Sequence, residues 1–354
     1  MIINRREFTG IASSLPLIPR GVSFTSDESG GLRDVSGLKV GHFTDSRRPT
    51  GCTVILSETG AVAGVDVRGS APGTRETDLL DPVNTVHRVH AIVLSGGSAF
   101  GLDTAGGAVQ YLEEKGIGYQ TSVARVPIVP AAILFDLAVG DSSIRPDRKA
   151  GYQACLNATD GKIEEGNVGA GAGATVGKML GMNYAMKGGL GTASIQVEGL
   201  VVAALVAVNC VGDVTDPRDG TILAGARNQE NDAFVDTTSL LKRRLRGGRA
   251  RKSENTTLAV VATNAAFGKS EMTKIAQMSH DGFARAIRPV HLPFDGDTIF
   301  SLSTGTFESA NLAQVGSLAA EVTAAAIVRA ILAAESLPNL PAHRDFVKNK
   351  KSSS

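Results

Sequence analysis

Any core formed by this sequence has to rely on small aliphatic side chains and close backbone contacts. The chain has 41 glycines and no tryptophan, and aromatic residues make up only 5% of it. Hydrophobic residues account for 42% and charged residues for 20%, a balance typical of globular proteins. Glycine lets backbones approach one another, and protein interiors are packed with few voids. The composition therefore favours tightly packed layers of helices and sheets.

Charge and cysteine usage narrow the classes of partner. The net charge is +1, which supplies no field that would attract nucleic acid or a membrane, so neither is expected as a partner. Small neutral or zwitterionic substrates fit better. The three cysteines, Cys52, Cys155 and Cys210, lack metal-ligand spacing and are interpreted as small buried hydrophobes. We expect no metal, no cofactor and no apolar run of the ~18–20 residues that span a bilayer.

The first 35 residues are interpreted as a leader or tail outside the fold. Arg5 and Arg6 followed by a short apolar stretch resemble a twin-arginine export signal, although Pro16 interrupts that stretch. Export would place the protein in the periplasm, and a plain disordered leader would leave it in the cytoplasm. Residues 36–354 are expected to form a single catalytic domain.

Short apolar runs alternate with glycine turns and amphipathic segments through that domain. The runs predict strands at 53–56, 61–67, 91–95, 194–197, 200–208 and 256–262. Helical spacing predicts helices at 102–115 and 269–287, and a nearly all-apolar helix at 310–334 must be buried on most sides. Strands grouped with amphipathic helices favour an α/β arrangement with helices on the outer faces of sheets.

The character of the sequence changes at residue 256, where a polar segment meets a strand. Residues 213–255 are polar, end in a basic run, and are predicted to be a flexible loop, whereas a strand begins at Thr256. A hydroxyl at that position can attack the Asn255 carbonyl in an N-to-O acyl shift. Hydrolysis of the ester frees an amine whose pKa of ~7.7–8.0 suits a general base. Asn-Thr-Thr also occurs at plain loop-to-strand joins and matches a glycosylation sequon.

Several longer stretches carry a resemblance to a known family. They are VDVRGSAPGTRETDLL (65–80), LSGGSAFGLDTAGG (94–107), GAGAGATVGK (169–178), GGLGTAS (188–194), NTTLAVVATNA (255–265) and DGDT (295–298). With these stretches the chain resembles the DmpA family, the L-aminopeptidase D-amidase/D-esterase group of N-terminal-nucleophile hydrolases. Its threonine branch includes nylon-oligomer and pantetheine hydrolases.

The resemblance implies a fold and a processing event. The fold is a four-layer αββα sandwich within the α/β (α+β) class. The precursor would cut itself into an α chain, 1–255, and a β chain, 256–354, and 213–255 would be the loop before the cut. Family members are commonly tetramers of cleaved protomers, so a homo-oligomer is expected.

The resemblance also implies site residues. Thr256 takes the nucleophile position and Asn255 precedes the cut. Lys178 matches a lysine near the nucleophile, or it is a solvated lysine after a glycine turn. Asn209 ends a buried strand, where its amide either donates to an oxyanion or caps the turn. Asp295 and Asp297 bracket Gly296, so both carboxylates either face the nucleophile or form an ordinary Asp-Gly turn.

A second glycine turn has no recognised phosphate-binding pattern. Gly96, Gly97 and Ser98 match neither GxxxxGK[ST] nor GxGxxG, and we interpret them as oxyanion or cleft backbone, with close packing as the alternative. Phe135 stands in the region where some family members place a tyrosine near the oxyanion. The six histidines form no metal or triad pattern and are interpreted as structural.

The leading functional interpretation is an aminopeptidase or amidohydrolase that acts on small peptides or amino-acid amides through Thr256 and an acyl-enzyme. Two alternatives remain at this level. One is an acyltransferase of the ornithine acetyltransferase type, which self-processes to a threonine nucleophile as well. The other is a non-catalytic homologue that has kept the architecture.

Overall fold

The structure is a computed structural model and describes residues 30–243 and 255–346. Its α-helices are α1 (Thr104–Glu114), α2 (Arg148–Leu156), α3 (Thr237–Arg243), α4 (Lys269–Ala286) and α5 (Leu312–Ala333). The strands of the main sheet are β1 (Lys39–Thr44), β2 (Gly51–Val67), β3 (Thr74–Arg75), β4 (Arg88–Ser95), β7 (Ala131–Ile133), β10 (Gly189–Val197), β11 (Leu200–Val208), β14 (Leu258–Ala265) and β16 (Thr298–Phe307). Short ladders are formed by β5 (Tyr119–Gln120) with β6 (Arg125–Val126), by β8 (Thr175–Val176) with β9 (Met186–Lys187), and by β12 (Asp213–Thr215) with β13 (Ile222–Ala224) and β15 (Ile287–Arg288).

One long strand joins two layers of the main sheet. The strand order is β10-β11-β14-β16-β2-β4-β7-β3, with β1 paired to β2. The first part of β2 pairs with β1 and β4, whereas residues 62–67 pair with β16. Between these parts the register shifts, and Gly60 adopts a φ of +78°, which favours glycine. A single hydrogen-bonded sheet thereby folds over on itself.

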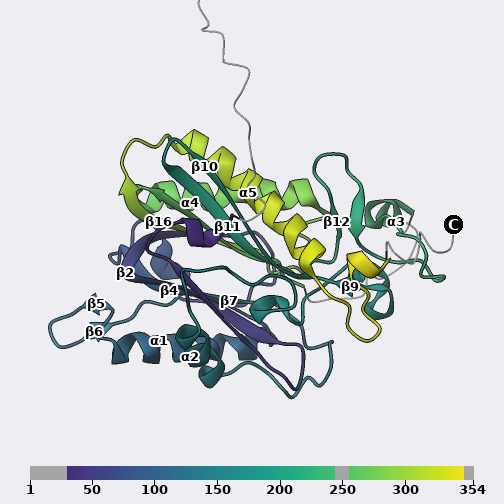
Figure 1. Ribbon diagram of the computed structural model, residues 1–354, viewed down its shortest axis with the longest axis horizontal. Helices are drawn as coiled ribbons and strands as arrows, with labels where there is room; N and C mark the ends of the chain where they lie inside the picture. Colours follow the sequence, from purple (N-terminus) through teal and green to yellow (C-terminus); the bar gives the residue numbers. More distant parts are fainter. Residues whose placement is uncertain (1–29, 244–254, 347–354) are drawn as a thin grey trace, which may run out of the picture.

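Helices cover both outer faces of the folded sheet (Figure 1). Helices α4 and α5 pack on one part, with the even-numbered residues of β11 from Val202 to Val208 in the core between them. Ala203, Leu205 and Ala207 point the opposite way, into a second core between the two sheet layers. A third core lies beneath α1 and α2. The order helix, sheet, sheet, helix confirms the predicted αββα sandwich.

Helix α5 is the nearly all-apolar helix that the sequence predicts at 310–334. By length and composition it could cross a bilayer, with a mean hydropathy of 1.7 in its most apolar window, so the statement that no run reaches that length is wrong. In the fold, 61% of that window is buried. The backbone of β10 lies so close that a Cβ on Gly191 would sit 2.2 Å from the Ala326 carbonyl oxygen. These contacts are those of a core helix.

Two predicted boundaries need correction. Residues 30–35 belong to the fold, because Leu32 and Val35 are fully buried and the Leu32 N–H donates to Thr192 Oγ1 at 2.9 Å. The earlier residues of the proposed leader lie outside the described residues, as do 244–254 of the proposed loop. Residues 213–243 are not a flexible loop: Asp213 is buried and accepts hydrogen bonds from the Thr237 N–H and hydroxyl at 2.7 Å each. The polar composition suggested a loop because it does not show that hydrogen bonds, such as those to Asp213, hold these short strands in place.

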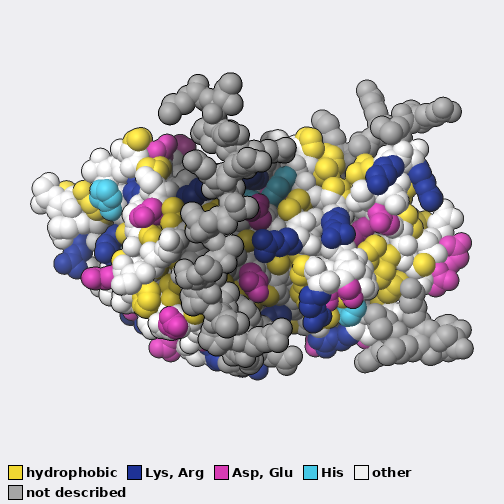
Figure 2. All heavy atoms as spheres, turned by 90° about the horizontal axis from the view of Figure 1, so that it is seen from above, with side chains coloured by type: hydrophobic (Ala, Val, Ile, Leu, Met, Phe, Trp, Pro, Cys, Tyr) yellow, Lys and Arg dark blue, Asp and Glu magenta, His cyan; other side chains and the backbone are white. Residues whose placement is uncertain are grey.

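The surface view agrees with the near-zero net charge. On the face drawn in Figure 2, Lys and Arg side chains are interspersed with Asp and Glu side chains among the described residues. Such a surface produces little long-range attraction for a strongly charged partner.

A buried lysine holds the glycine-rich loop 169–177 in place. Lys187 is fully buried, and its ammonium donates to the carbonyl oxygens of Gly171, Ala174 and Gly188 at 2.8, 3.1 and 3.0 Å. Burial lowers its pKa to about 7. The loop therefore depends on a donor supplied from the following strand, β9.

We predict that Lys187→Met lowers the free energy of unfolding by about 2–4 kcal/mol, because it leaves buried carbonyls without their donor. Denaturant unfolding of the variant measures the effect. Lys274→Met, which removes an exposed lysine from α4, is the matched control, with an expected change within about 0.5 kcal/mol. Equal midpoints for the two variants would contradict the prediction.

Candidate active site

Four chain segments meet at one edge of the sheet because of how their strands pair. Strands β14 and β16 are parallel, with Leu258 opposite Thr298, so the residues before each strand lie side by side. Asn255 forms a bridge with Asp295 there. Strand β11 runs antiparallel to β14 and ends at the same edge, which brings Asn209. Strand β2 ends opposite Thr298 and leads into residues 68–71.

The peptide bond between Asn255 and Thr256 lies at the centre of this edge. Both residues are almost fully buried, at 2% and 3% exposure. The Thr256 N–H donates to the Asn209 carbonyl oxygen at 3.2 Å, and the Thr256 hydroxyl lies 2.5 Å from the Asn255 carbonyl oxygen. That oxygen also accepts the Gly296 N–H at 2.9 Å. The hydroxyl is thus held against the carbonyl group that precedes it.

Both predicted aspartates are buried beside this bond. Asp297 Oδ1 accepts the Thr257 N–H at 2.8 Å, which fixes the start of β14. Asp295 Oδ2 accepts the Leu292 N–H at 3.0 Å, and its Oδ1 is buried without a hydrogen-bond partner. Burial, with the Asp297 charge adding to it, raises the pKa of Asp295 to about 7. This carboxyl can accept or release a proton near neutral pH.

Lys178 and Asn209 form a pair behind the threonine. Lys178 is buried, and its ammonium donates to the side-chain and main-chain oxygens of Asn209 at 2.9 and 3.1 Å. Burial lowers the pKa of Lys178 to about 7. Asn209 Oδ1 also accepts the Thr175 N–H at 3.0 Å, and its Nδ2 donates to the Phe135 carbonyl oxygen at 3.1 Å. Asn209 therefore contacts Thr256 through its backbone carbonyl, and its Nδ2 is directed to Phe135 instead of the Asn255 oxygen.

The Gly96–Gly97–Ser98 turn does not offer free backbone donors. Its three N–H groups donate to the Gly51 carbonyl, the Asp136 carboxylate and the Leu134 carbonyl at 2.9–3.0 Å. Asp136 is itself buried against Arg48, with 2.8 Å between the charged groups. The predicted oxyanion role is corrected to close packing, because donors already engaged are not available to a substrate. The turn is linked to the site through Asp136, which accepts the Gly97 N–H and follows Phe135, whose carbonyl oxygen accepts Asn209 Nδ2.

Sequence reasoning missed one histidine at the site. His291 Nδ1 lies 2.9 Å from Asp297 Oδ2, and its Nε2 is buried without a partner. His280 packs edge-on against it, with ring centroids 4.7 Å apart. His291, interpreted from the sequence as structural, therefore lies at the candidate site. Its position four residues before Asp295 is the sequence feature that could have indicated this. No group of three or more His, Cys, Asp or Glu side chains in 30–243 and 255–346 is arranged to hold a metal ion.

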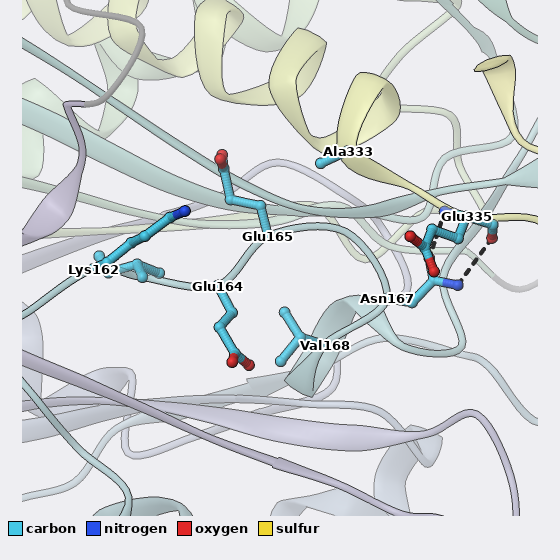
Figure 3. Close-up of a pocket in the computed structure, with 8 residues that line it drawn as sticks. Lys162, Glu164, Glu165, Asn167, Val168, Ala333 and Glu335 are labelled. Atoms are coloured by element: carbon cyan, nitrogen blue, oxygen red, sulfur yellow. Dashed lines mark hydrogen bonds between the residues drawn. The ribbon is translucent and has the colours of Figure 1, made fainter.

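A separate cavity of about 450 Å³ lies beside the end of α5 (Figure 3). It is lined mainly by residues 162–168 and by Ala333 and Glu335, and it shares no residue with the site around Thr256. Asn167 and Glu335 close one side through two side-chain to backbone hydrogen bonds, at 2.9 and 3.1 Å. Glu165 is paired with Arg329 at 2.6 Å. At least one charged side chain that lines the cavity is thus already paired within the fold.

Comparison with known proteins gives consistent matches. Residues 31–344 match the model of peptidase family S58. An uncharacterized aminopeptidase of Mycobacterium leprae is 39% identical, covering 88% of this chain and 92% of the relative. A 6-aminohexanoate-oligomer endohydrolase of Agromyces sp. is 28% identical, covering 84% of both.

Solved structures share the fold at low sequence identity. The L-aminopeptidase D-Ala-esterase/amidase of Ochrobactrum anthropi, described as a variant of the Ntn hydrolase fold, matches with a TM-score of 0.66 at 20% identity over 92% of this chain and 94% of that one. A β-aminopeptidase of Burkholderia sp. matches with a TM-score of 0.64 at 20% identity, covering 93% and 95%. These matches extend over nearly the whole sandwich.

The raised pKa of Asp295 predicts a pH-dependent stability. Between its ordinary value of 3.8 and about 7, the folded state holds a proton that the unfolded state releases, so this group's contribution to stability is lost as pH rises through that window. Asp295→Asn removes the ionisable group. We expect the melting temperature of the variant relative to wild type to become more positive from pH 5 to pH 8.

Thermal unfolding at both pH values measures this difference. Asp281→Asn, which removes an exposed carboxylate from α4, is the control and is expected to change less. A difference that stays flat or falls with pH for Asp295→Asn would contradict the assignment of Asp295 as a buried group with a raised pKa.

Proposed function

The chain belongs to peptidase family S58 and is a hydrolase, and from this membership we propose that it cuts itself between Asn255 and Thr256 and then uses Thr256 as its N-terminal nucleophile. The observation that carries the proposal is the contact between the Thr256 hydroxyl and the Asn255 carbonyl group at a buried, rigid strand start.

The proposed cleavage is an acyl shift followed by hydrolysis. Thr256 Oγ1 attacks the Asn255 carbonyl carbon, the carbon–nitrogen bond breaks, and the hydroxyl proton ends on the Thr256 nitrogen. Water then hydrolyses the ester, which restores the hydroxyl and leaves Asn255 as a carboxylate. The Thr256 nitrogen stays near the Asn209 carbonyl oxygen, which already accepts its N–H and would orient the new amine.

In the mature enzyme the same residue would supply nucleophile and base. A free α-amine has a pKa near 7.7–8.0, so about neutral pH it can take the proton from its own hydroxyl as that oxygen attacks an amide. We infer that Asp295 and Lys178, each with a pKa of about 7 because of burial, assist this proton transfer. The acyl-enzyme is released to water.

The substrate class follows from the reaction and the relatives. The relatives are named as an aminopeptidase and as an oligomer endohydrolase, names that both denote hydrolysis of a chain of linked units. We infer that small peptides, amino-acid amides or similar oligomers are the substrates. The net charge of +1 suits small neutral or zwitterionic molecules. Assembly of cleaved protomers into a homo-oligomer is part of the same proposal.

We predict that the purified protein consists of two associated chains, the first ending at Asn255 and the second beginning at Thr256. Thr256→Ala removes the hydroxyl and is expected to give a folded, uncleaved and inactive protein, whereas Thr256→Ser keeps a hydroxyl and still processes. Thr257→Ala, one residue along, is the control and is expected to cleave. Intact-mass spectrometry and N-terminal sequencing check the result, and an uncleaved wild type would refute the proposal.

A second prediction concerns Asp297. Its Oδ1 accepts the Thr257 N–H and its Oδ2 accepts the main-chain N–H of His291, so an asparagine, which has only one acceptor oxygen, would face one of these donors with its NH₂ group. Asp297→Asn is therefore expected to lower turnover by about 100-fold or more with the fold retained. Steady-state kinetics on amino-acid amides and near-UV circular dichroism measure the two quantities. Turnover within a few fold of wild type would remove Asp297 from the site.

A further inference from the structure

The residue between the two aspartates touches the reacting group directly. The Gly296 N–H donates to the Asn255 carbonyl oxygen at 2.9 Å. A Cβ built on Gly296 would lie 2.6 Å from Thr256 Oγ1, 2.7 Å from the Ala71 carbonyl oxygen and 3.2 Å from Pro72 Cα. Gly296 therefore donates a hydrogen bond at the bond proposed to break, and it also leaves space there because it has no side chain.

We propose that Gly296 is a catalytic residue of the self-cleavage: its N–H stabilises the oxyanion that forms on Asn255, and its missing side chain leaves the space that the Thr256 hydroxyl occupies. The inference rests on the proposed function, because it concerns the acyl shift at that bond. As the bond from Oγ1 to the carbonyl carbon forms, the electron pair moves to the carbonyl oxygen, which already lies against this N–H. The pair returns when the carbon–nitrogen bond breaks.

The other predicted oxyanion donors are directed elsewhere. Asn209 Nδ2 donates to the Phe135 carbonyl oxygen, and its Oδ1 and main-chain oxygen both face Lys178. The backbone N–H groups of Gly96, Gly97 and Ser98 all donate to other segments of the fold, at Gly51, Asp136 and Leu134. Of these donors and Gly296, it is the Gly296 N–H that donates to the Asn255 carbonyl oxygen.

The Gly296 peptide is held from both sides, as a preorganised donor has to be. The carbonyl of Asp295 accepts the Ala71 N–H at 2.9 Å, and the carbonyl of Asp297 accepts the N–H groups of Arg68 and Gly69 at 3.0 and 3.2 Å. A donor fixed before reaction loses little energy to reorganisation, and removing one such donor commonly costs about 100- to 1,000-fold in rate. The segment 68–71 therefore aims the Gly296 N–H.

Space, rather than backbone conformation, requires glycine at this position. Gly296 is not among the glycines with positive φ, so another residue could adopt its backbone angles. The obstacles are the Thr256 hydroxyl at 2.6 Å and the Ala71 carbonyl oxygen at 2.7 Å, both closer than real Cβ atoms approach their neighbours. A methyl group here would push the hydroxyl away from the Asn255 carbonyl.

The test follows processing of newly made protein. Wild type, Gly296→Ala and the control Gly106→Ala are made by cell-free translation, and the fraction of intact chain is followed by mass spectrometry. A Cβ on Gly106 meets nothing nearer than 3.8 Å, so this control carries the same chemical change without a clash. We expect Gly296→Ala to process about 100-fold more slowly or worse, and Gly106→Ala to match wild type.

Two further variants separate donor and space from misfolding. Replacing Gly296 by glycolic acid through backbone ester incorporation exchanges the N–H for an ester oxygen without adding a side chain, and is expected to slow processing by about 100-fold. Thr256→Ser added to Gly296→Ala removes the γ-methyl and lets the hydroxyl rotate, so processing is expected to recover partly.

The outcomes distinguish the inference from the proposed function. An uncleaved wild type overturns the proposed function itself. A wild type that cleaves, together with an ester variant that cleaves equally fast, overturns the donor role. Cleavage of Gly296→Ala at the rate of Gly106→Ala overturns the role of the empty space, and partial recovery in the double variant supports it.

Discussion

The parallel pairing of β14 with β16 is the constraint on which the site depends. Parallel neighbours place both strand starts at one edge, so two segments 40 residues apart in sequence become adjacent there. The hydrogen bond from the Thr257 N–H to Asp297 ties them side by side. Antiparallel β11 and β2 then end at the same edge and supply Asn209 and residues 68–71. Slipping this pair by one residue would separate the Thr256 hydroxyl from Gly296.

Burial gives this edge its chemistry and also makes it costly. Asp295, Asp297 and Lys178 are at most 5% exposed, in a region where charge is weakly solvated. Opposite charges and oriented backbone groups offset part of that penalty, and the remainder appears as pKa values near 7 for Asp295 and Lys178. Groups that ionise near neutrality are suited to proton transfer. Burying these charged groups makes the fold less stable than an apolar edge would, and the proposed reaction would use the same groups.

The position of the proposed cut explains how two chains would remain one molecule. The segment 256–354 carries β14 and β16, which lie in the middle of the sheet between β11 and β2, and it carries α4 and α5, which cover one face. Neither piece has a complete core by itself, because the apolar faces of β11 and β2 are buried against elements of the other piece. Cleavage after residue 255 would break one peptide bond and leave these apolar contacts in place.

The family resemblance indicated the candidate residues Lys178, Asn209, Asp295 and Asp297 and the nucleophile role of Thr256. Local sequence by itself determined the glycine-rich, Trp-free composition, the apolar runs that became β2, β4, β11 and β14, and the helices α4 and α5. Patterns of burial and of side-chain type are local properties, so a chain read alone reveals them. The sequence by itself did not reveal that 213–243 is ordered, that the Gly96 turn has no free donors, or that His291 meets Asp297. Those depend on which distant strand edges are paired. By sequence, Gly296 is an ordinary turn glycine. Only the tertiary structure decided that it lies against the Asn255 carbonyl oxygen and the Thr256 hydroxyl, because hydrogen bonds from residues 68–71 hold the neighbouring backbone there.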